Sequence, residues 1–419
     1  MSNSSVSSLV AICVSTIVLF DVAAYFFVPS SYTGFSPDYR DVEVLVDRAS
    51  LQADSERDDP SQPQSVKEYP RDYFEADKIL GFDIRPGAST IARFAEGKYP
   101  IFSNELGCFD KNKLSDFQKS EQYVYFAGDS FTWGYSRYEK KFPTIWEQHS
   151  RMLTAKCGVT NTGQLHQFEK FKRVASRIGS YPKVVFVGMF PNDPANDLAY
   201  PHTTVISGYL VDTAYLRGSA IVRPSMGDLT SMVESSLREY EHMYKREESA
   251  WTRLKTYLKV YSLSANLLQA WKRYAFPSSQ PSHSASAKLF GETVSEAFTY
   301  AEVKSLYLKD DRAARSRTVI KEWAEHAKAN GYQLVFLLIP RKEYYDDIEY
   351  FSQVKEWLDL CGVDYLDFTI VFKKRGFTMH DVFWRIDGHL SEDGNQIVGD
   401  ELFNVTSNSK WLGNVGGNP

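Results

Sequence analysis

The chain has 419 residues, of which 43% are hydrophobic and 24% are charged. This length and composition are enough for a full hydrophobic core and predict one large domain with additions. The net charge of -5 and the pI near 6.0 argue against a nucleic-acid partner, because proteins that bind nucleic acids carry an excess of basic residues.

The N-terminal residues predict a membrane anchor. Leu9 to Val28 form an almost uninterrupted apolar stretch, in which the polar side chains are Ser15, Thr16 and Asp21. About 20 apolar residues are enough to cross the hydrocarbon core of a bilayer. We therefore expect an uncleaved single-pass anchor and a membrane-bound protein.

Two alternatives to this anchor stay open, and its orientation is a separate question. Val22-Ala23-Ala24 offers the small residues of a signal-peptide cleavage site, although no Lys or Arg precedes the apolar stretch. A buried core helix is the second alternative. Arg40 and Arg48 follow the stretch, so the positive-inside rule does not place the rest of the chain outside the cytoplasm.

Residues 31–75 are rich in Ser, Pro and Asp. Such a composition buries little apolar surface, and we expect a flexible tether.

A serine follows the first strongly apolar segment. Tyr123 to Ala127 read as a buried strand that ends at Gly128, and Ser130 comes just after it. Ligands of open parallel sheets bind at the carboxyl ends of the strands. Gly128 permits a sharp turn there, and the backbone N–H groups beyond the turn can stabilise an oxyanion. Ser130 is therefore the predicted nucleophile of an acyl transfer.

A second apolar strand begins at Val184 and is followed by Asn192. An amide N–H at the end of a strand can stabilise a tetrahedral intermediate, so Asn192 is the predicted oxyanion donor. The sequence Asn192-Asp193-Pro194 reads equally well as a turn capped by side-chain hydrogen bonds.

A long insertion separates this strand from the next ones. From Met226 to Phe276 the apolar residues have helical spacing, and Pro277 to Ser284 read as a loop. We expect a mostly helical insertion, for which a lid over the site is one conceivable role.

The remaining pattern alternates helices with strands. Ala313 to Asn330 read as a helix that ends at Gly331, and Leu334 to Ile339 and Asp364 to Asp367 read as strands. Alternating elements predict a parallel sheet covered on both faces, which is a three-layer, flavodoxin-like α/β sandwich.

Asp387-Gly388-His389 supplies the predicted base. The i, i+2 spacing in an extended segment or turn puts the side chains of Asp387 and His389 on one side. Asp387 can then orient the imidazole that accepts the Ser130 proton. The three residues also read as a simple turn, and a helix is expected to follow them.

Neither a metal nor a cofactor is expected. His380 and Asp381 lie near Asp387 and His389 in the sequence, but their spacing is unlike that of metallohydrolases and a serine nucleophile needs no metal. The chain has four cysteines and no C-x-x-C pair, which argues against a zinc site or a disulfide framework. One disulfide among three of them stays open, namely Cys108, Cys157 and Cys361.

These motifs resemble those of the SGNH (GDSL-type) hydrolase superfamily. Ser130 matches the nucleophile of its first block, Asn192 the oxyanion donor of its third, and Asp387 with His389 the last block. Gly163 is the match to the glycine of the second block, although Gln164-Leu165-His166 follow it in place of further glycines.

Two further segments extend the resemblance to residues 78–205 and 310–405. Asn104 to Asp110 look like the N-x-x-G-x-R-D segment of membrane-anchored bacterial members, with Phe109 where arginine is usual. Phe336 to Glu343 are similar to a strand-then-proline segment in relatives involved in polysaccharide acylation.

The resemblance implies a serine esterase or O-acetyltransferase that forms an acyl-enzyme on Ser130. It also implies an acylated carbohydrate or other ester of the cell envelope as substrate and a catalytic domain outside the cytoplasm. The irregular second block favours the alternative of a non-catalytic glycan-binding or assembly module. The predicted segments are a membrane anchor in residues 1–30, a flexible tether in 31–75, the first part of the SGNH domain in 76–205, a mostly helical insertion in 206–309, the second part in 310–405 and a tail in 406–419.

Overall fold

A computed structural model describes residues 15–16, 69–94, 97–217, 219–234, 292–293, 311–384, 388–407 and 411. The chain forms two compact units, and nearly all of the first, residues 1–62, 95–97 and 238–282, lies outside the described residues. The predicted anchor in residues 1–30 is therefore almost wholly outside them. Within the described part, none of the helices combines the length and the apolar character that a membrane span needs.

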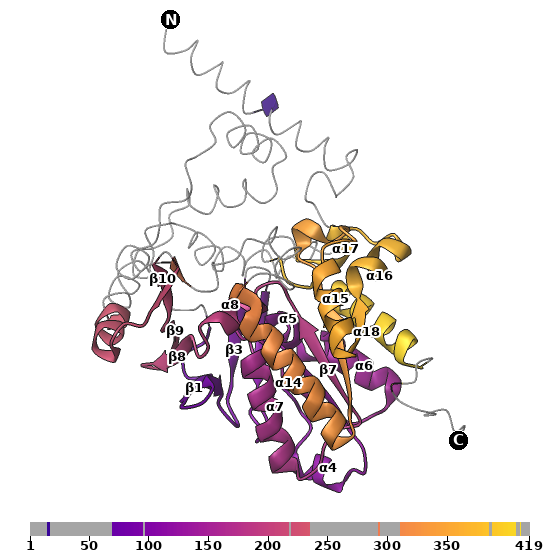
Figure 1. The fold of residues 1–419 in the computed structure, drawn as a ribbon, viewed down its shortest axis with the longest axis horizontal. Coiled ribbons are helices and arrows are strands. Elements are labelled where there is room, and N and C mark those ends of the chain that lie inside the picture. The colour runs from indigo at the N-terminus through magenta and orange to yellow at the C-terminus, as the bar shows by residue number, and fades with distance from the viewer. Residues whose placement is uncertain are drawn as a thin grey trace, which may run out of the picture. The chain divides into compact units, whose positions relative to one another are not determined.

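Five parallel strands form the central sheet of the second unit (Figure 1). The strands are β5 (Val124–Gly128), β6 (Thr154–Lys156), β7 (Val184–Met189), β13 (Gln333–Leu338) and β14 (Asp364–Asp367). Their order across the sheet is β14-β13-β7-β5-β6. In chain order this is the flavodoxin-like arrangement, and its switch point lies between β5 and β7.

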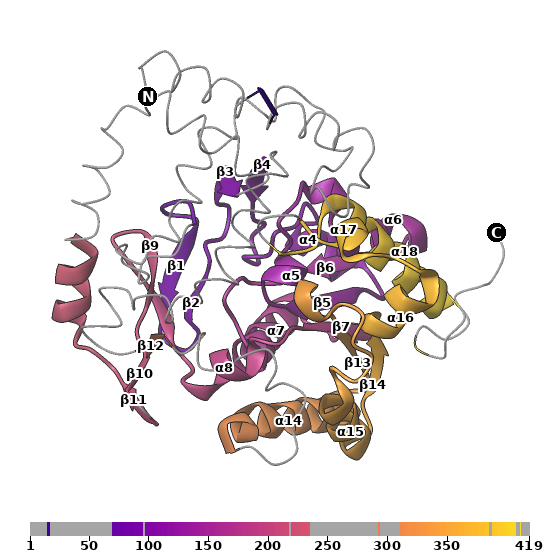
Figure 2. The same cartoon turned by 90° about the horizontal axis from the view of Figure 1, so that it is seen from above.

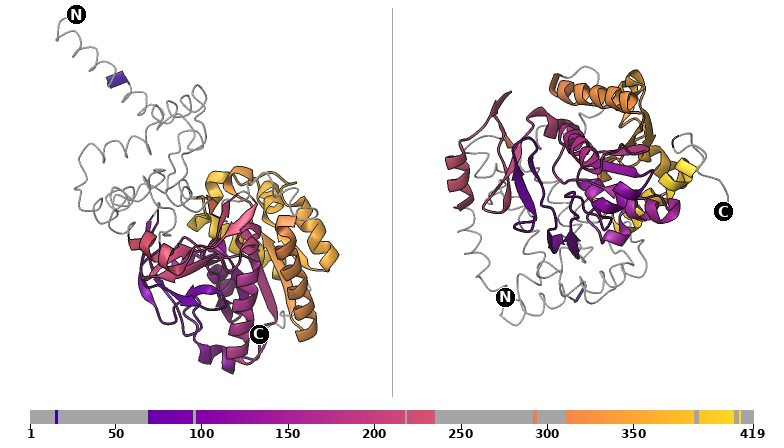
Figure 3. Two further views of the ribbon diagram at one scale, coloured as in Figure 1. Left: turned by 60° about the vertical axis from the view of Figure 1, so that its left-hand side comes forward. Right: turned by 90° about the horizontal axis from the view of Figure 1, so that it is seen from below.

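Helices cover both faces of this sheet because the apolar side chains of each strand alternate between the faces. Tyr125 belongs to one buried cluster and its neighbour Phe126 to the other. Figures 2 and 3 show the helices around the sheet from three further sides. The first cluster contains residues of α7 (Gln164–Ile178), α14 (Ala314–Asn330) and α15 (Ser352–Cys361), and the second contains residues of α6 (Phe142–Ser150), α16 (Phe368–Arg375) and α18 (Glu392–Ser407). The prediction of a parallel sheet with flanking helices is confirmed.

Short elements complete the described fold. The helices are α4 (Leu114–Lys119), α5 (Ser130–Trp133), α8 (Asp193–Leu198) and α17 (Met379–Val382), with single 3-10 turns at Tyr138–Lys140, Asp311–Ala313 and Lys342–Tyr344. The antiparallel pairs are β1 (Phe74–Asp77) with β2 (Gly81–Ile84), β3 (Ser89–Phe94) with β4 (Gly97–Phe102), and β8 (Thr203–Ile206) with β9 (Tyr209–Asp212).

The described residues of the insertion 206–309 contain short strands as well as a helix, and the prediction of a mostly helical segment concerns residues that lie largely outside the described part. Beyond β9, β10 (Tyr215–Arg217) pairs with both β11 (Ala220–Val222) and β12 (Glu292–Thr293). Residues 226–234 are helical as predicted, and the rest of the predicted helical stretch lies outside the described residues. Strands this short carry too few residues for a period of two to be recognised.

Described residues beyond both predicted boundaries of the domain pack against the fold. The tether was predicted to reach residue 75, but Tyr73 and Phe74 are buried and pack edge-on against each other. The tail was predicted to begin at residue 406, but Thr406 is buried and its hydroxyl accepts the Trp146 indole N–H at 3.1 Å. The Trp411 indole N–H donates to Asp364 at 2.9 Å. Aromatic side chains in polar stretches thus extend the fold at both ends.

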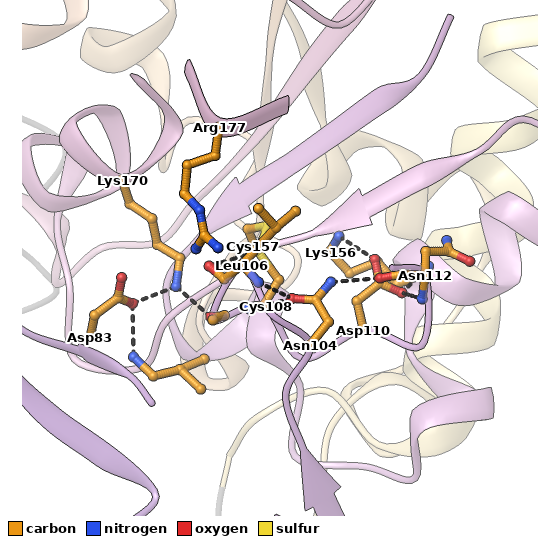
Figure 4. Close-up of a disulfide and its surroundings, with 12 residues drawn as sticks. Asp83, Asn104, Leu106, Cys108, Asp110, Asn112, Lys156, Cys157, Lys170 and Arg177 are labelled. Carbon is orange, nitrogen blue, oxygen red and sulfur yellow. Dashed lines mark hydrogen bonds and ion pairs between the residues drawn. A yellow bond between two sulfur atoms is a disulfide. The ribbon is translucent and has the colours of Figure 1, made fainter. Parts of the chain in front are cut away.

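A disulfide joins Cys108 to Cys157 directly after β6 (Figure 4). The Asn104 side chain accepts the backbone N–H groups of Leu106 and Cys108 at 3.0 and 3.1 Å, which holds the turn before the disulfide. Asp110 forms a buried ion pair with Lys156 at 2.9 Å. The residues of the N-x-x-G-x-x-D segment therefore anchor this loop to the edge of the sheet.

Replacing both Cys108 and Cys157 by alanine is expected to lower the free energy of unfolding by about 2–4 kcal/mol, because the closed loop would no longer restrict the unfolded chain. Urea unfolding without reductant measures the change. Cys361→Ala is the matched control, because Cys361 is not in a disulfide. Equal stability of the double variant and the wild type would contradict the prediction.

Candidate active site

Ser130 is placed by a tight turn between β5 and α5. Gly128 has φ 147, and a Cβ atom there would lie 2.0 Å from Thr132 Oγ1. Asp129 caps α5 by accepting the Phe131 backbone N–H at 2.9 Å. Ser130 is the first residue of α5 and only 8% exposed.

Glycine on the neighbouring strand brings α5 close to the sheet. Gly188 of β7 pairs with Gly128, and a Cβ atom at Gly188 would lie 2.2 Å from Thr132 Oγ1. Gly158, after β6, is similarly close, because its Cβ would lie 2.5 Å from the Trp133 backbone nitrogen. The serine helix thus lies directly on the carboxyl ends of β5, β6 and β7.

His389 reaches Ser130 from the other end of the chain. Its Nε2 atom lies 2.8 Å from Ser130 Oγ. The loop that carries it is closed by an antiparallel bridge between Phe383 and Leu390. Within this loop the Trp384 backbone N–H donates to the His389 carbonyl oxygen at 2.7 Å. The structure therefore brings the predicted nucleophile and base together, whereas Asp387 lies outside the described residues.

Two aromatic rings enclose the His389 imidazole. The Tyr135 ring stacks on it with a centroid distance of 3.9 Å and an interplanar angle of 12°. The Phe131 ring lies at 4.5 Å and 34°, and it stacks in turn on Phe190. Such contacts fix the orientation of a ring and favour a cation in it.

Tyr135 is itself held in place. Its carbonyl oxygen accepts the Trp384 indole N–H at 2.8 Å, and its hydroxyl contacts the hydroxyl of Tyr69, which also contacts Thr160. Sequence reasoning missed these aromatic residues. The run of Phe131, Trp133 and Tyr135 directly after Ser130 is the signal that could have indicated them.

Tyr135→Ala is expected to lower kcat by about three- to tenfold, because one ring contact contributes about 0.5–1.5 kcal/mol to the position of the imidazole. Tyr135→Phe retains the ring and should stay closer to wild type. Steady-state hydrolysis of p-nitrophenyl acetate is the measurement. Wild-type kcat in the alanine variant would show that the stack does not position His389.

The two predicted oxyanion residues follow the strands on either side of β5. Gly163 lies after β6 and is the N-cap residue of α7, and Asn192 lies after β7 and is the N-cap residue of α8. The Asn192 side chain lies close enough to Asp129 to lower the pKa of its carboxyl group. Both residues thus lie at the carboxyl edge of the sheet, where Ser130 also lies.

Asp129 was not predicted as a site residue. Burial raises the pKa of its carboxyl group to about 6, although the Phe131 backbone N–H, His389 and Asn192 lower it. Burial and the neighbouring Asp129 also raise the pKa of Asp193 well above its ordinary value. Asp193 accepts Gln164 Nε2 at 2.6 Å and the Phe190 backbone N–H at 3.0 Å. Carboxyl groups with strongly raised pKa values are typical of functional sites.

The raised pKa of Asp129 predicts how stability depends on pH. Since the pKa rises from 3.8 to about 6 on folding, folding favours the protonated form. The contribution of the Asp129 carboxyl group to the free energy of unfolding is fully present below about pH 4. It is lost as the pH rises through about 6.

The stability of Asp129→Asn relative to wild type should therefore be greater at about pH 7 than at about pH 4. Asparagine is also a good N-cap residue. Urea unfolding at both pH values measures this difference, and Asp346→Asn, at an exposed position, is the control. A difference in stability that does not change with pH would contradict the prediction.

Among the described residues, no group of three or more His, Cys, Asp and Glu side chains could hold a metal ion. The alternative considered from the sequence was a metal site formed by His380, Asp381, Asp387 and His389. Asp387 lies outside the described residues.

Comparisons with known proteins identify similar solved structures only. No family model and no curated protein sequence matches the chain. A lipolytic protein of the G-D-S-L family from Desulfitobacterium hafniense is similar over 68% of this chain and 99% of its own, with 11% identity and a TM-score of 0.31. An acetylxylan esterase from Geobacillus stearothermophilus is similar over 70% and 97%, with 12% identity and a TM-score of 0.31.

An α/β hydrolase from the metagenome of Lake Arreo, Spain, is similar over 69% of this chain and 96% of its own, with 9% identity and a TM-score of 0.33. At these identities and TM-scores, the residues of the chain itself carry the evidence for its function.

Proposed function

We propose that the chain is a serine-dependent O-acyl ester hydrolase or acyltransferase of the SGNH type. The observation that supports this most directly is the 2.8 Å distance between Ser130 Oγ and His389 Nε2. Ser130 and Asn192 follow β5 and β7, which flank the switch point of the sheet, where ligands of such folds bind.

In the proposed reaction, Ser130 Oγ attacks the ester carbonyl carbon while His389 Nε2 takes the hydroxyl proton. The tetrahedral intermediate collapses, the ester C–O bond breaks, and His389 returns the proton to the leaving alcohol. The backbone N–H groups of Ser130 and Gly163 and the Asn192 amide are the proposed oxyanion donors. The proposed role of Asp387, which is to orient the His389 imidazole, rests on the resemblance alone.

The acyl-enzyme is then released to water or to the hydroxyl group of an acceptor. His389 takes a proton from this second nucleophile as it attacks the acyl carbon, and it gives the proton to Ser130 Oγ as the bond between Oγ and the acyl carbon breaks. Incubation with an acetyl donor and candidate oligosaccharides, followed by comparison of free acetate with acetylated sugar, distinguishes hydrolysis from transfer.

The proposed substrate is an acylated carbohydrate of the cell envelope or an exported carbohydrate, and the proposed place of the domain is outside the cytoplasm on an N-terminal anchor. The resemblance and the apolar stretch Leu9 to Val28 favour this. The disulfide between Cys108 and Cys157 supports it, because disulfides persist mainly in oxidising compartments.

Ser130→Ala should abolish ester hydrolysis and labelling by a fluorophosphonate probe in the full-length chain. Because the Ser130 hydroxyl is buried and contacts His389, its loss should change the free energy of unfolding by about 1 kcal/mol. Active-site labelling with mass spectrometry and urea unfolding measure both effects.

The same experiment tests the alternative, a glycan-binding or assembly module without turnover. No labelling of Ser130 in the wild-type chain, under conditions in which a related esterase reacts, would support that alternative. Wild-type rates in Ser130→Ala would place the nucleophile elsewhere.

A further inference from the structure

The first turn of α7 begins without a side-chain cap of its own. Its N-cap residue is Gly163, which has no side chain to accept the free N–H groups of that turn. The Asp197 carboxylate of α8 supplies the missing acceptor, because its Oδ1 atom accepts the Leu165 backbone N–H at 2.9 Å. A residue 32 positions away thus replaces the usual N-cap.

Gly163 also lies in direct contact with α8. A Cβ atom built on Gly163 would lie 2.4 Å from Asp197 Oδ1 and 2.6 Å from the Asp193 carbonyl oxygen. Only glycine fits this approach. Since α8 begins directly after Asn192, the two residues assigned to the oxyanion hole share one short helix as their support.

The other carboxylate oxygen of Asp197 is bound to a third element. Asp197 Oδ2 accepts the hydroxyl proton of Ser316 at 2.5 Å, and Ser316 lies in the first turns of α14. Asp197 is 1% exposed. Its orientation is therefore fixed from both sides, by α7 and by α14.

Stability alone is a poor explanation for this buried carboxylate. Burial raises its pKa to about 7, although hydrogen bonds from Ser316 and from the α7 backbone lower it. The ionised form therefore costs folding energy. Groups that cost folding energy and contact a predicted site residue, as Asp197 contacts the Gly163 position, are candidates for function.

We propose that Asp197 is a positioning residue of the oxyanion hole, which holds the start of α7 so that the Gly163 N–H faces the reacting carbonyl. This role rests on the proposed function, because it requires an oxyanion to form at Ser130. Asp197 acts through Gly163 and does not itself touch the substrate.

Steady-state hydrolysis of p-nitrophenyl acetate by the full-length chain tests this role. Asp197→Ala should lower kcat by about 10²-fold, the loss that follows removal of one oxyanion donor, and should change KM by less than about threefold. Asp197→Asn retains an oxygen that can accept the Leu165 N–H, so it should recover most of the activity.

Asp367→Ala is the matched control. Asp367 is buried and caps α16 by accepting the Thr369 backbone N–H at 2.9 Å, so its loss should reduce stability and leave kcat within about threefold of wild type. An equal fall of kcat in both alanine variants, or wild-type kcat in Asp197→Ala, overturns the proposal.

Ser316→Ala is the second variant, in case Asp197→Ala does not fold. It frees one carboxylate oxygen and should lower kcat about threefold or more with KM unchanged. Wild-type kcat in Ser316→Ala, with Asp197→Ala unfolded, overturns the proposal. If the wild-type chain neither hydrolyses the ester nor reacts with the fluorophosphonate probe at Ser130, the proposed function itself fails, and the role of Asp197 fails with it.

Discussion

The parallel pairing of β5 with β7 is the contact on which the candidate site depends. Gly128 and Gly188 lie opposite each other in this pair, and a Cβ atom at either would lie within 2.2 Å of Thr132 Oγ1. Because both positions are glycine, α5 lies directly on the edge of the sheet, and Ser130 lies where the strand order reverses. His389 completes the site from a loop near the C-terminus, which is itself held by Trp384.

Two kinds of support surround the pair of Ser130 and His389. An aromatic layer encloses the imidazole, with Tyr135 on one side. On the side of the oxyanion residues, buried carboxyl groups of α8 tie α7 to the end of β7. Burial raises the pKa of Asp193 and Asp197, so the ionised groups cost folding energy. These carboxyl groups are therefore retained at some cost in stability. Such a cost is typical of residues that shape a functional site.

The central sheet and the order of the motifs were predictable, whereas the accessory parts were not. All-apolar runs identify central strands because both faces of the sheet are covered, as in β7. The spacing of apolar residues identified α14 to within one residue. Composition and spacing are least informative where tertiary contacts bury residues of polar segments and where strands are short. Tyr73 and Phe74 follow a polar segment but are buried, and the strands β8 to β11 are too short to produce a readable period.

The sequence by itself determined the parallel α/β sheet, the turn at Gly128 and the candidate roles of Ser130 and His389, because these follow from local apolar runs, glycine positions and motif order. Only the tertiary structure decided which cysteines pair, which ring covers His389 and which carboxylate caps α7. The partners of the disulfide are separated by 49 positions and Leu165 and Asp197 by 32. Such contacts depend on how the elements pack in space, and local propensity carries no information about them.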